Sequence, residues 1–140
     1  MKQPDGHINR KVCQWIEIAE EDYRLAVHGM TLSTGTPFRL VAYHAQQCAE
    51  KHIKAWLVYN NVDFPFTHNL GFLLTLCLKH TTWKPELEEA GDLTVYAITT
   101  RYPGISERVT EAEAIHAIEI AKKVKDAVLE QLSEKGFKIE

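Results

Sequence analysis

Cysteine is scarce in this sequence, and its three copies stand far apart. Cys13, Cys48 and Cys77 form no C-x-x-C pair, so their spacing excludes a zinc ribbon and a disulfide-stapled fold. Such usage is typical of a reducing, cytoplasmic setting. Long apolar runs are also missing, since no stretch approaches the ~18 apolar residues that cross a bilayer and Met1–Arg10 has no signal-peptide core. We therefore expect neither export nor membrane insertion.

Positive charge is not in excess either. Sixteen Lys and Arg against nineteen Asp and Glu give a formal charge of −3, so the chain as a whole repels a polyanion such as DNA. Any contact with a nucleotide or with RNA must therefore be local. The 140 residues, 45% hydrophobic and 25% charged, have the length and composition of one globular domain. We assign residues 1–140 to a single domain whose core spans about 10–133.

Sharp enzymatic signatures are missing as well. The sequence holds seven histidines but no H-E-x-x-H motif, and their positions lack the paired spacing of metal ligands. It has no glycine-rich phosphate loop and no G-x-S-x-G nucleophile motif. We therefore expect no metal site and no cofactor.

Apolar residues recur at helical spacing, and strand signals are absent. The first such segment covers residues 10–30, and a flexible loop is predicted over residues 31–37. A second helix is expected to start there, with Thr36 as N-cap and Pro37 at the first helical position. This helix is predicted to run to about Asn60 or Asn61, because asparagine is common at the ends of helices.

Three further helical segments follow. Asn69 or Thr67 is expected to cap a short third helix that ends around residues 80–82. Pro85 opens a fourth region through Ile98, with Gly91 as its weak point. A capping box at Thr110-x-x-Glu113 begins the last helix, which runs to about Ser133. The predicted fold is all-α, an up-and-down four-helix bundle with an additional short helix.

The second helix has two contrasting faces. Its apolar face, expected to face the core, contains Ala42, Ala45, Ala49, Ile53, Trp56 and Leu57. Its opposite arc, expected to face water, carries His44, Gln47, Glu50, Lys51 and Lys54. The i, i+3, i+7 spacing of His44, Gln47 and Lys51 forms a ridge of N–H donors that suits phosphate oxygens, and Lys54 extends its positive end. The alternative is an ordinary solvated helix face, in which Glu50 pairs with Lys54.

Four stretches of the sequence resemble the HEPN family, the "higher eukaryotes and prokaryotes nucleotide-binding" domain. The run His44–Lys51, continued by Lys54-Ala55, is similar to its second-helix signature. Trp-x-x-x-Ala-Glu-Glu-Asp at residues 15–22 resembles its first helix, and Phe64-Pro65 with Thr67–Leu70 resembles its inter-helix turn. Arg101-Tyr102-Pro103 resembles its late turn. The resemblance covers about residues 10–130.

The resemblance implies an all-α bundle, often a homodimer, that binds nucleotides and frequently works beside a separately encoded minimal nucleotidyltransferase, as in a toxin–antitoxin type pair. We therefore expect a helical module that binds a nucleotide or such a partner. The residues that the ridge and the resemblance place at this surface are His44, Gln47, Lys51, Lys54, His68 and Arg101. For His68 a capping role remains an equal alternative.

Some members of the family are ribonucleases with Arg-x(4–6)-His on a late helix. This chain departs from that motif, because no histidine follows Arg101 at that spacing and seven residues separate Arg108 from His116. Arg39 and His44 have four residues between them but lie on the second helix, about 140° apart around its axis. A binding module with no catalysis or only weak catalysis is therefore our first hypothesis, and a ribonuclease toxin, with Arg39 and His44 as its candidate catalytic residues, is the alternative.

A third hypothesis is a purely structural homodimer. Ile18 and Leu25 lie seven residues apart, outside the main apolar stripe of the first helix, and form a secondary stripe that a second copy can cover. The lysines at 122, 123 and 125 are interpreted as a solvated face rather than an RNA-binding patch.

Overall fold

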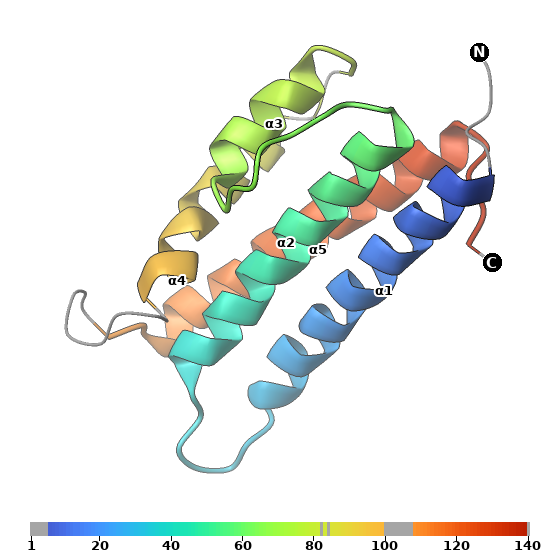
Figure 1. Cartoon of the computed structure of the whole chain (residues 1–140). Helices are drawn as coiled ribbons and strands as arrows, with labels where there is room; N and C mark the ends of the chain where they lie inside the picture. Colours follow the sequence, from blue (N-terminus) through green and yellow to red (C-terminus); the bar gives the residue numbers. More distant parts are fainter. Residues whose placement is uncertain (1–5, 82, 84, 100–107, 140) are drawn as a thin grey trace.

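The computed structural model describes residues 6–81, 83, 85–99 and 108–139. The regular secondary structure of these residues is all helical, without strands, so the all-α prediction is confirmed. In chain order the elements are α1 (Gly6–Gly29), α2 (Phe38–Tyr59), α3 (Leu70–Leu78), the 3-10 helix η1 (Pro85–Leu93), α4 (Thr94–Thr99) and α5 (Glu111–Glu134) (Figure 1). Among the described residues, no helix combines the length and the apolar character needed to cross a membrane.

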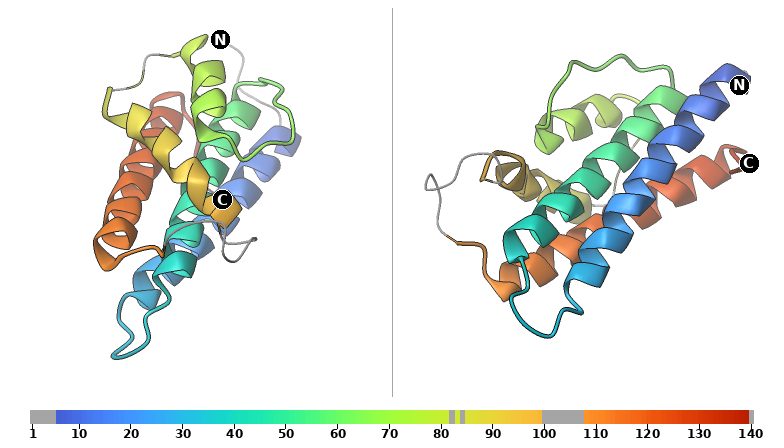
Figure 2. Two further views of the ribbon diagram at one scale, coloured as in Figure 1. Left: turned by 90° about the vertical axis from the view of Figure 1, so that its left-hand side faces the viewer. Right: turned by 60° about the horizontal axis from the view of Figure 1, so that its bottom comes forward.

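Helix α2 is the centre of the bundle. It packs against α1 and α5 and also touches α3, η1 and α4. Two further views show α1, α2 and α5 side by side, with α3 and α4 on the flank of α2 away from α1 (Figure 2). The residues of its predicted apolar face are all buried, which confirms that prediction: Ala42, Ala45, Ala49, Ile53, Trp56 and Leu57.

Two of the predicted helix starts are confirmed in atomic detail. At α5 the backbone N–H of Glu113 donates to Thr110 Oγ1 (3.1 Å), and Glu113 Oε1 accepts from the backbone N–H of Thr110 (3.0 Å). At α3 the Asn69 side chain accepts from the backbone N–H of Phe72 (3.0 Å). Each side chain satisfies a backbone donor that the first helical turn leaves without a partner.

The predicted start of α2 is wrong by one position. The helix begins at Phe38, and Pro37 itself is the N-cap residue, with no side-chain capping bond. Its ψ of 77° lies outside the helical region, so it cannot serve as the first helical residue. The Thr36 hydroxyl points back along the loop instead, where it donates to the carbonyl of Leu32 (3.4 Å).

The fourth helical region is not one long α-helix but a 3-10 helix followed by a short α-helix. Its first nine residues form η1, and a regular α-helix resumes for only six residues in α4. Gly91, the weak point in the sequence, packs against α3: a Cβ at Gly91 would stand 3.7 Å from the Cα of Gly71. Gly91 lies within η1 and disfavours a continuous α-helix. The bundle therefore has three long helices, and shorter ones complete it.

Candidate functional site

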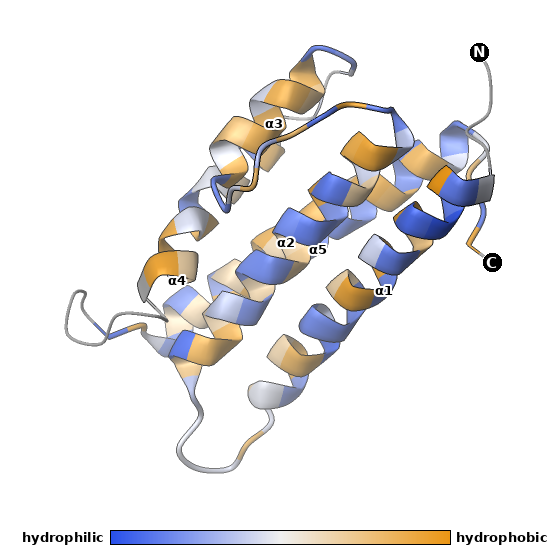
Figure 3. Ribbon diagram, in the orientation of Figure 1, coloured by the Kyte–Doolittle hydropathy of each residue, from blue (hydrophilic) through white to orange (hydrophobic). Residues whose placement is uncertain are grey.

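The polar arc of α2 does not face water as the sequence predicts. Gln47, Glu50 and Lys54 are only 7%, 2% and 5% exposed. Residues 60–69, which join α2 to α3 and which we call the strap, pass over this side of α2 (Figure 1). Coloured by hydropathy, α2 shows hydrophilic positions beneath the strap and toward α1 (Figure 3). The expectation of a solvated strip is therefore wrong for these three residues.

Three side chains meet where α1 and α2 face each other, and we call them the Asp22 cluster. Lys51 Nζ donates to Asp22 Oδ2 (2.6 Å), and His44 Nδ1 lies 2.8 Å from Asp22 Oδ1. Because a carboxylate only accepts hydrogen bonds, Nδ1 of His44 carries the proton. Asp22 is 9% exposed, whereas the side chains of His44 and Lys51 are 25% and 22% exposed. The cluster is thus a buried carboxylate with two partly exposed donors.

A second polar group, which we call the Glu50 cluster, lies beneath the strap. Glu50 Oε1 accepts from Gln46 Nε2 (2.8 Å) and lies 2.8 Å from His68 Nδ1, while Glu50 Oε2 accepts from Lys54 Nζ (3.0 Å). Gln47 Nε2 donates to Gln46 Oε1 (2.7 Å) and extends the chain of bonds. These contacts tie the strap to α2 at His68. The Glu50 cluster is therefore an internal brace.

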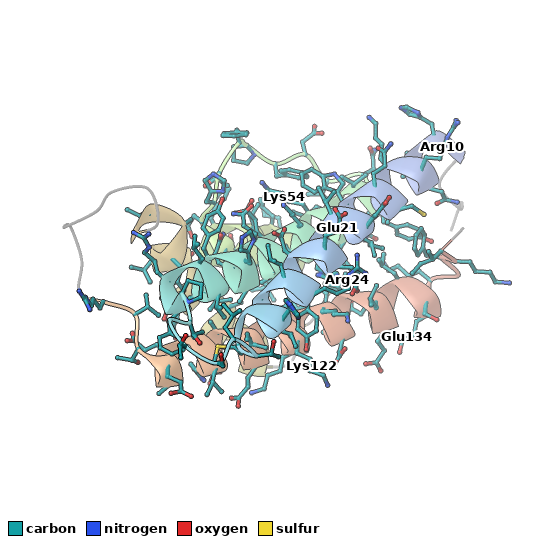
Figure 4. All side chains as sticks on the ribbon, turned by 90° about the horizontal axis from the view of Figure 1, so that it is seen from below. Arg10, Glu21, Arg24, Lys54, Lys122 and Glu134 are labelled. Carbon is teal, nitrogen blue, oxygen red and sulfur yellow. The ribbon has the colours of Figure 1, made fainter. Side chains whose placement is uncertain are left out.

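Aromatic rings surround the ammonium group of Lys54. Its Nζ lies 5.6 Å, 5.7 Å and 5.9 Å from the ring centroids of Trp15, Phe64 and Phe66, at cation–π distance. The rings of Trp15 and Phe64 also meet edge to face, with centroids 6.5 Å apart. In Figure 4, Lys54 lies on the side of the molecule that carries the strap, opposite Lys122 and Glu134 of α5. The buried ammonium group and the rings of Trp15 and Phe64 together hold the strap against α1.

An open groove runs between α1 and α2 beside Trp15, and we call it the α1–α2 groove. Its volume is about 460 Å³. The residues that line it are Lys11, Gln14, Trp15, Ile18 and Val58. This volume lies within the range of small-molecule sites, which are apolar with a few polar groups at the rim.

A third cluster lies deeper, where α1, α2 and α5 meet. His52 donates through Nδ1 to the carbonyl of Cys48 (2.9 Å), and its buried Nε2 has no hydrogen-bond partner. That atom lies 3.5 Å from Glu20 Oε1, whose other oxygen lies 3.1 Å from Lys125 Nζ. Burial lowers the pKa of His52 below that of a free histidine and raises that of the Cys48 thiol, so neither group suits proton transfer or nucleophilic attack near neutral pH.

The structure brings together only part of the predicted site. His44 and Lys51 meet at Asp22, while Gln47 turns into the Glu50 cluster together with Lys54 and His68. Arg101 lies outside the described residues. In the ribonuclease pair, Arg39 is exposed in the first turn of α2 while His44 is committed to Asp22. Whether these residues bind or cleave anything stays a prediction.

Sequence reasoning missed the acceptors. Asp22 and Glu50 organise the two clusters, and neither was a candidate site residue. The signal available for Asp22 is its place on the buried side of α1, one turn from Ala19 and Ala26, where an unpaired carboxylate is rare. No group of three or more His, Cys, Asp or Glu side chains suited to a metal ion occurs among the described residues.

The family of the chain follows from comparison with known proteins. A model of the HEPN domain matches residues 12–132, which is most of the sequence. This chain belongs to the HEPN family. The resemblance found in the sequence is thereby confirmed, and the helices described above are those of a HEPN domain.

Two crystal structures share this HEPN architecture. ST0689, an archaeal HEPN homologue, is 25% identical with a TM-score of 0.70, over 94% of this chain and 99% of that one. TT1696 from Thermus thermophilus is 26% identical with a TM-score of 0.77, over 87% of this chain and 98% of that one. A comparison with curated proteins gives no match. Family membership thus accounts for the fold, whereas the identity of a ligand depends on the side chains of this chain.

Proposed function

We propose that this HEPN domain is a binding module that holds a nucleotide between the Asp22 cluster and the α1–α2 groove. The observation that carries the proposal is the convergence of the Lys51 ammonium and the His44 imidazole on one carboxylate, Asp22, which follows by one helical turn a residue of the groove that Trp15 lines. Phosphate oxygens accept hydrogen bonds, and cationic N–H groups are their strongest donors in proteins.

Both donors keep capacity for a ligand. An ammonium group has three N–H bonds, and Lys51 directs one of them to Asp22. His44 uses Nδ1 at Asp22, which leaves Nε2 for a further partner. Because Asp22 already holds both side chains in place, less conformational entropy is lost when a phosphate binds.

The groove offers a surface for the base. Trp15, Ile18 and Val58 present an aromatic ring and aliphatic groups, against which a planar base packs. Ile18 precedes Asp22 by one helical turn, a rise of about 6 Å along α1. A base in the groove and a phosphate at the Asp22 cluster are therefore within reach of one nucleotide.

Calorimetric titration of the wild-type chain with nucleoside monophosphates and dinucleotides tests the proposal. Lys51→Met keeps most of the side-chain volume but removes the ammonium group, and we expect it to weaken binding by about 10- to 100-fold, as for loss of a charge-assisted hydrogen bond. The matched control is Lys122→Met on α5, whose Nζ pairs with Asp126 at an exposed site (3.5 Å) on the opposite side of the molecule (Figure 4). It should leave affinity unchanged.

Two results contradict this function. The first is a wild-type chain that binds none of these nucleotides, and the second is equal affinity for the wild type and Lys51→Met while circular dichroism shows both folded. Cleavage of added RNA that is lost in both Arg39→Ala and His44→Ala would support the ribonuclease alternative instead.

A protein partner is the second candidate, because apolar residues are exposed on α1 and on the strap, among them Ile18 of the groove. Ile18 and Leu25 on α1 are 39% and 53% exposed, and Phe66 on the strap is 95% exposed. A minimal nucleotidyltransferase encoded beside this chain, or a second copy of it, would bury such residues. Ile18→Glu with Leu25→Glu should then abolish the complex in sedimentation and co-purification, while Ile115→Glu on α5 should not. If the double variant retains the complex, the partner binds elsewhere.

A further inference from the structure

Trp15 belongs both to the α1–α2 groove and to the contact between α1 and the strap. It lines the groove together with Ile18 and Val58. Its ring also meets the ring of Phe64 edge to face, with the centroids 6.5 Å apart and the ring planes at 68°. Both aromatic side chains are half-buried. The ring against which a base would pack in the groove is therefore also the ring that the strap contacts.

The middle of the strap, residues 63–67, has few other attachments. Within the described part of the chain, no backbone hydrogen bond joins these five residues to another segment. Asp63 and Pro65 are exposed, and Phe66 is almost fully exposed. The half-buried ring of Phe64 is thus the main apolar contact by which the middle of the strap is held against α1.

The local sequence prepares Phe64 for this contact. Pro65 fixes its own φ and restricts the residue before it to extended conformations, so little backbone entropy is lost when Phe64 packs. Trp15, in contrast, is a half-buried side chain on a helix, and such a side chain has more than one rotamer available unless its neighbours select one. The edge-to-face contact with Phe64 favours the rotamer of Trp15 in this structure.

We propose that Phe64 is a positioning residue of the nucleotide site, because it holds the ring of Trp15 in the orientation that packs against the base. This inference rests on the proposed function, since it concerns the same groove. It goes beyond that function by coupling the ligand to the strap. By linkage, attachment of the strap raises the affinity for the ligand by the same factor by which the bound ligand favours attachment of the strap.

Calorimetry with the methyl ester of adenosine monophosphate measures this factor, because the phosphodiester of this probe does not titrate near neutral pH. Phe64→Leu keeps an apolar side chain but removes the ring. We expect it to weaken binding by about 3- to 10-fold, as for loss of one edge-to-face aromatic pair. Phe64→Tyr keeps the ring and should bind with nearly the wild-type affinity.

Phe66→Leu is the matched control. Lys54 Nζ lies at similar distances from the rings of Phe64 and Phe66, 5.7 Å and 5.9 Å, but the ring contact with Trp15 is made by Phe64. Phe66→Leu therefore removes the same ring from the same strap without removing the contact with Trp15, and it should leave the affinity unchanged.

A double-variant cycle shows whether Phe64 acts through Trp15. Trp15→Leu removes the ring that packs against the base and should weaken binding. Addition of Phe64→Leu to Trp15→Leu should weaken binding little further, because the ring that Phe64 positions is already gone. If the effects of the two substitutions add in full, Phe64 acts by another route and the positioning role is wrong.

Limited proteolysis of the wild type tests the coupling without any variant. Chymotrypsin cuts after Phe66, and at low protease the rate follows the population of detached strap. Saturating methyl ester should slow this cut by about 3- to 10-fold, the same factor as in calorimetry. Cleavage after Leu32, in the loop at the other end of α1, should keep its rate (Figure 1). An unchanged rate at Phe66 would overturn the coupling even if Phe64→Leu does not fold.

The outcomes separate the inference from the function on which it rests. If the wild type binds the methyl ester and a folded Phe64→Leu binds it equally well, the positioning role is wrong while nucleotide binding stands. The same holds if Phe64→Tyr loses as much affinity as Phe64→Leu. If the wild type binds neither the methyl ester nor a dinucleotide, the proposed function fails and the positioning role fails with it.

Discussion

Replacement of Glu50 by alanine is expected to destabilise the domain strongly. Glu50 is 2% exposed and accepts from Gln46 and Lys54, with His68 Nδ1 2.8 Å away, so its removal leaves the buried Lys54 ammonium without a counter-charge. Breaking a buried ion pair on one side costs about 3–5 kcal/mol. For a domain of this length about 1 kcal/mol corresponds to roughly 3 °C, so Tm should fall by about 10–15 °C.

Thermal unfolding followed by circular dichroism measures this effect, and a double variant tests its cause. Glu50→Leu with Lys54→Met replaces both charges by apolar groups of similar volume, which should recover most of the lost stability. The surface control, Asp126→Ala, breaks an exposed pair with Lys122 and should change stability by about 0.5 kcal/mol or less. If the double variant is as unstable as Glu50→Ala, then lost packing and hydrogen bonds cause the destabilisation, rather than the unpaired charge of Lys54. If Tm falls by only a degree or two in Glu50→Ala, the buried ion pair does not stabilise the domain as we infer.

Three further perturbations have defined outcomes. Burial lowers the pKa of His52 below 6.5, so as pH falls the imidazole is protonated in the unfolded chain before it is protonated in the folded one. The free energy of unfolding should therefore decrease as pH drops below about 6.5. His52→Asn should flatten this decrease in urea-unfolding experiments, and an unchanged slope would contradict the prediction. Thr110→Ala removes the capping box of α5 and should cost about 1 kcal/mol in chemical denaturation, whereas Ser133→Ala should be nearly neutral. A Cβ at Gly29 would stand 2.9 Å from Val41 Cγ2, so Gly29→Ala should lower Tm and Val41→Ala should restore part of the loss; additive effects would show that the two positions do not touch.

Local signals predicted much of the fold. The spacing of Ala42, Ala45 and Ile53 sets the buried face of α2 because helical periodicity depends only on neighbouring residues. Thr110 and Asn69 could be assigned as caps for the same reason, since each bonds a backbone donor three residues ahead. In contrast, no local signal predicts that η1 packs on α3, because this packing, in which a Cβ at Gly91 would stand 3.7 Å from the Cα of Gly71, joins segments that are not adjacent in sequence.

The candidate site shows where sequence reasoning stopped. His44 and Lys51 were expected as donors, and they do lie together, but their common acceptor Asp22 comes from another helix, 22 and 29 residues away. The polar side of α2 beyond them is buried because the strap folds back over it through His68, 18 residues from Glu50. The amphipathic pattern of a helix cannot predict this burial, because a sequence does not distinguish a polar residue that is paired inside the protein from one that faces water.

The central claim is that a nucleotide lies against Asp22, Lys51 and Trp15, and backbone amide NMR during a titration with the methyl ester of adenosine monophosphate tests it most directly. We expect shift changes to concentrate on residues 11–22 of α1 and 44–58 of α2, with a much smaller response in Lys51→Met. Shift changes confined to α5, or a spectrum of the folded chain that stays unchanged at saturating ligand, would contradict it.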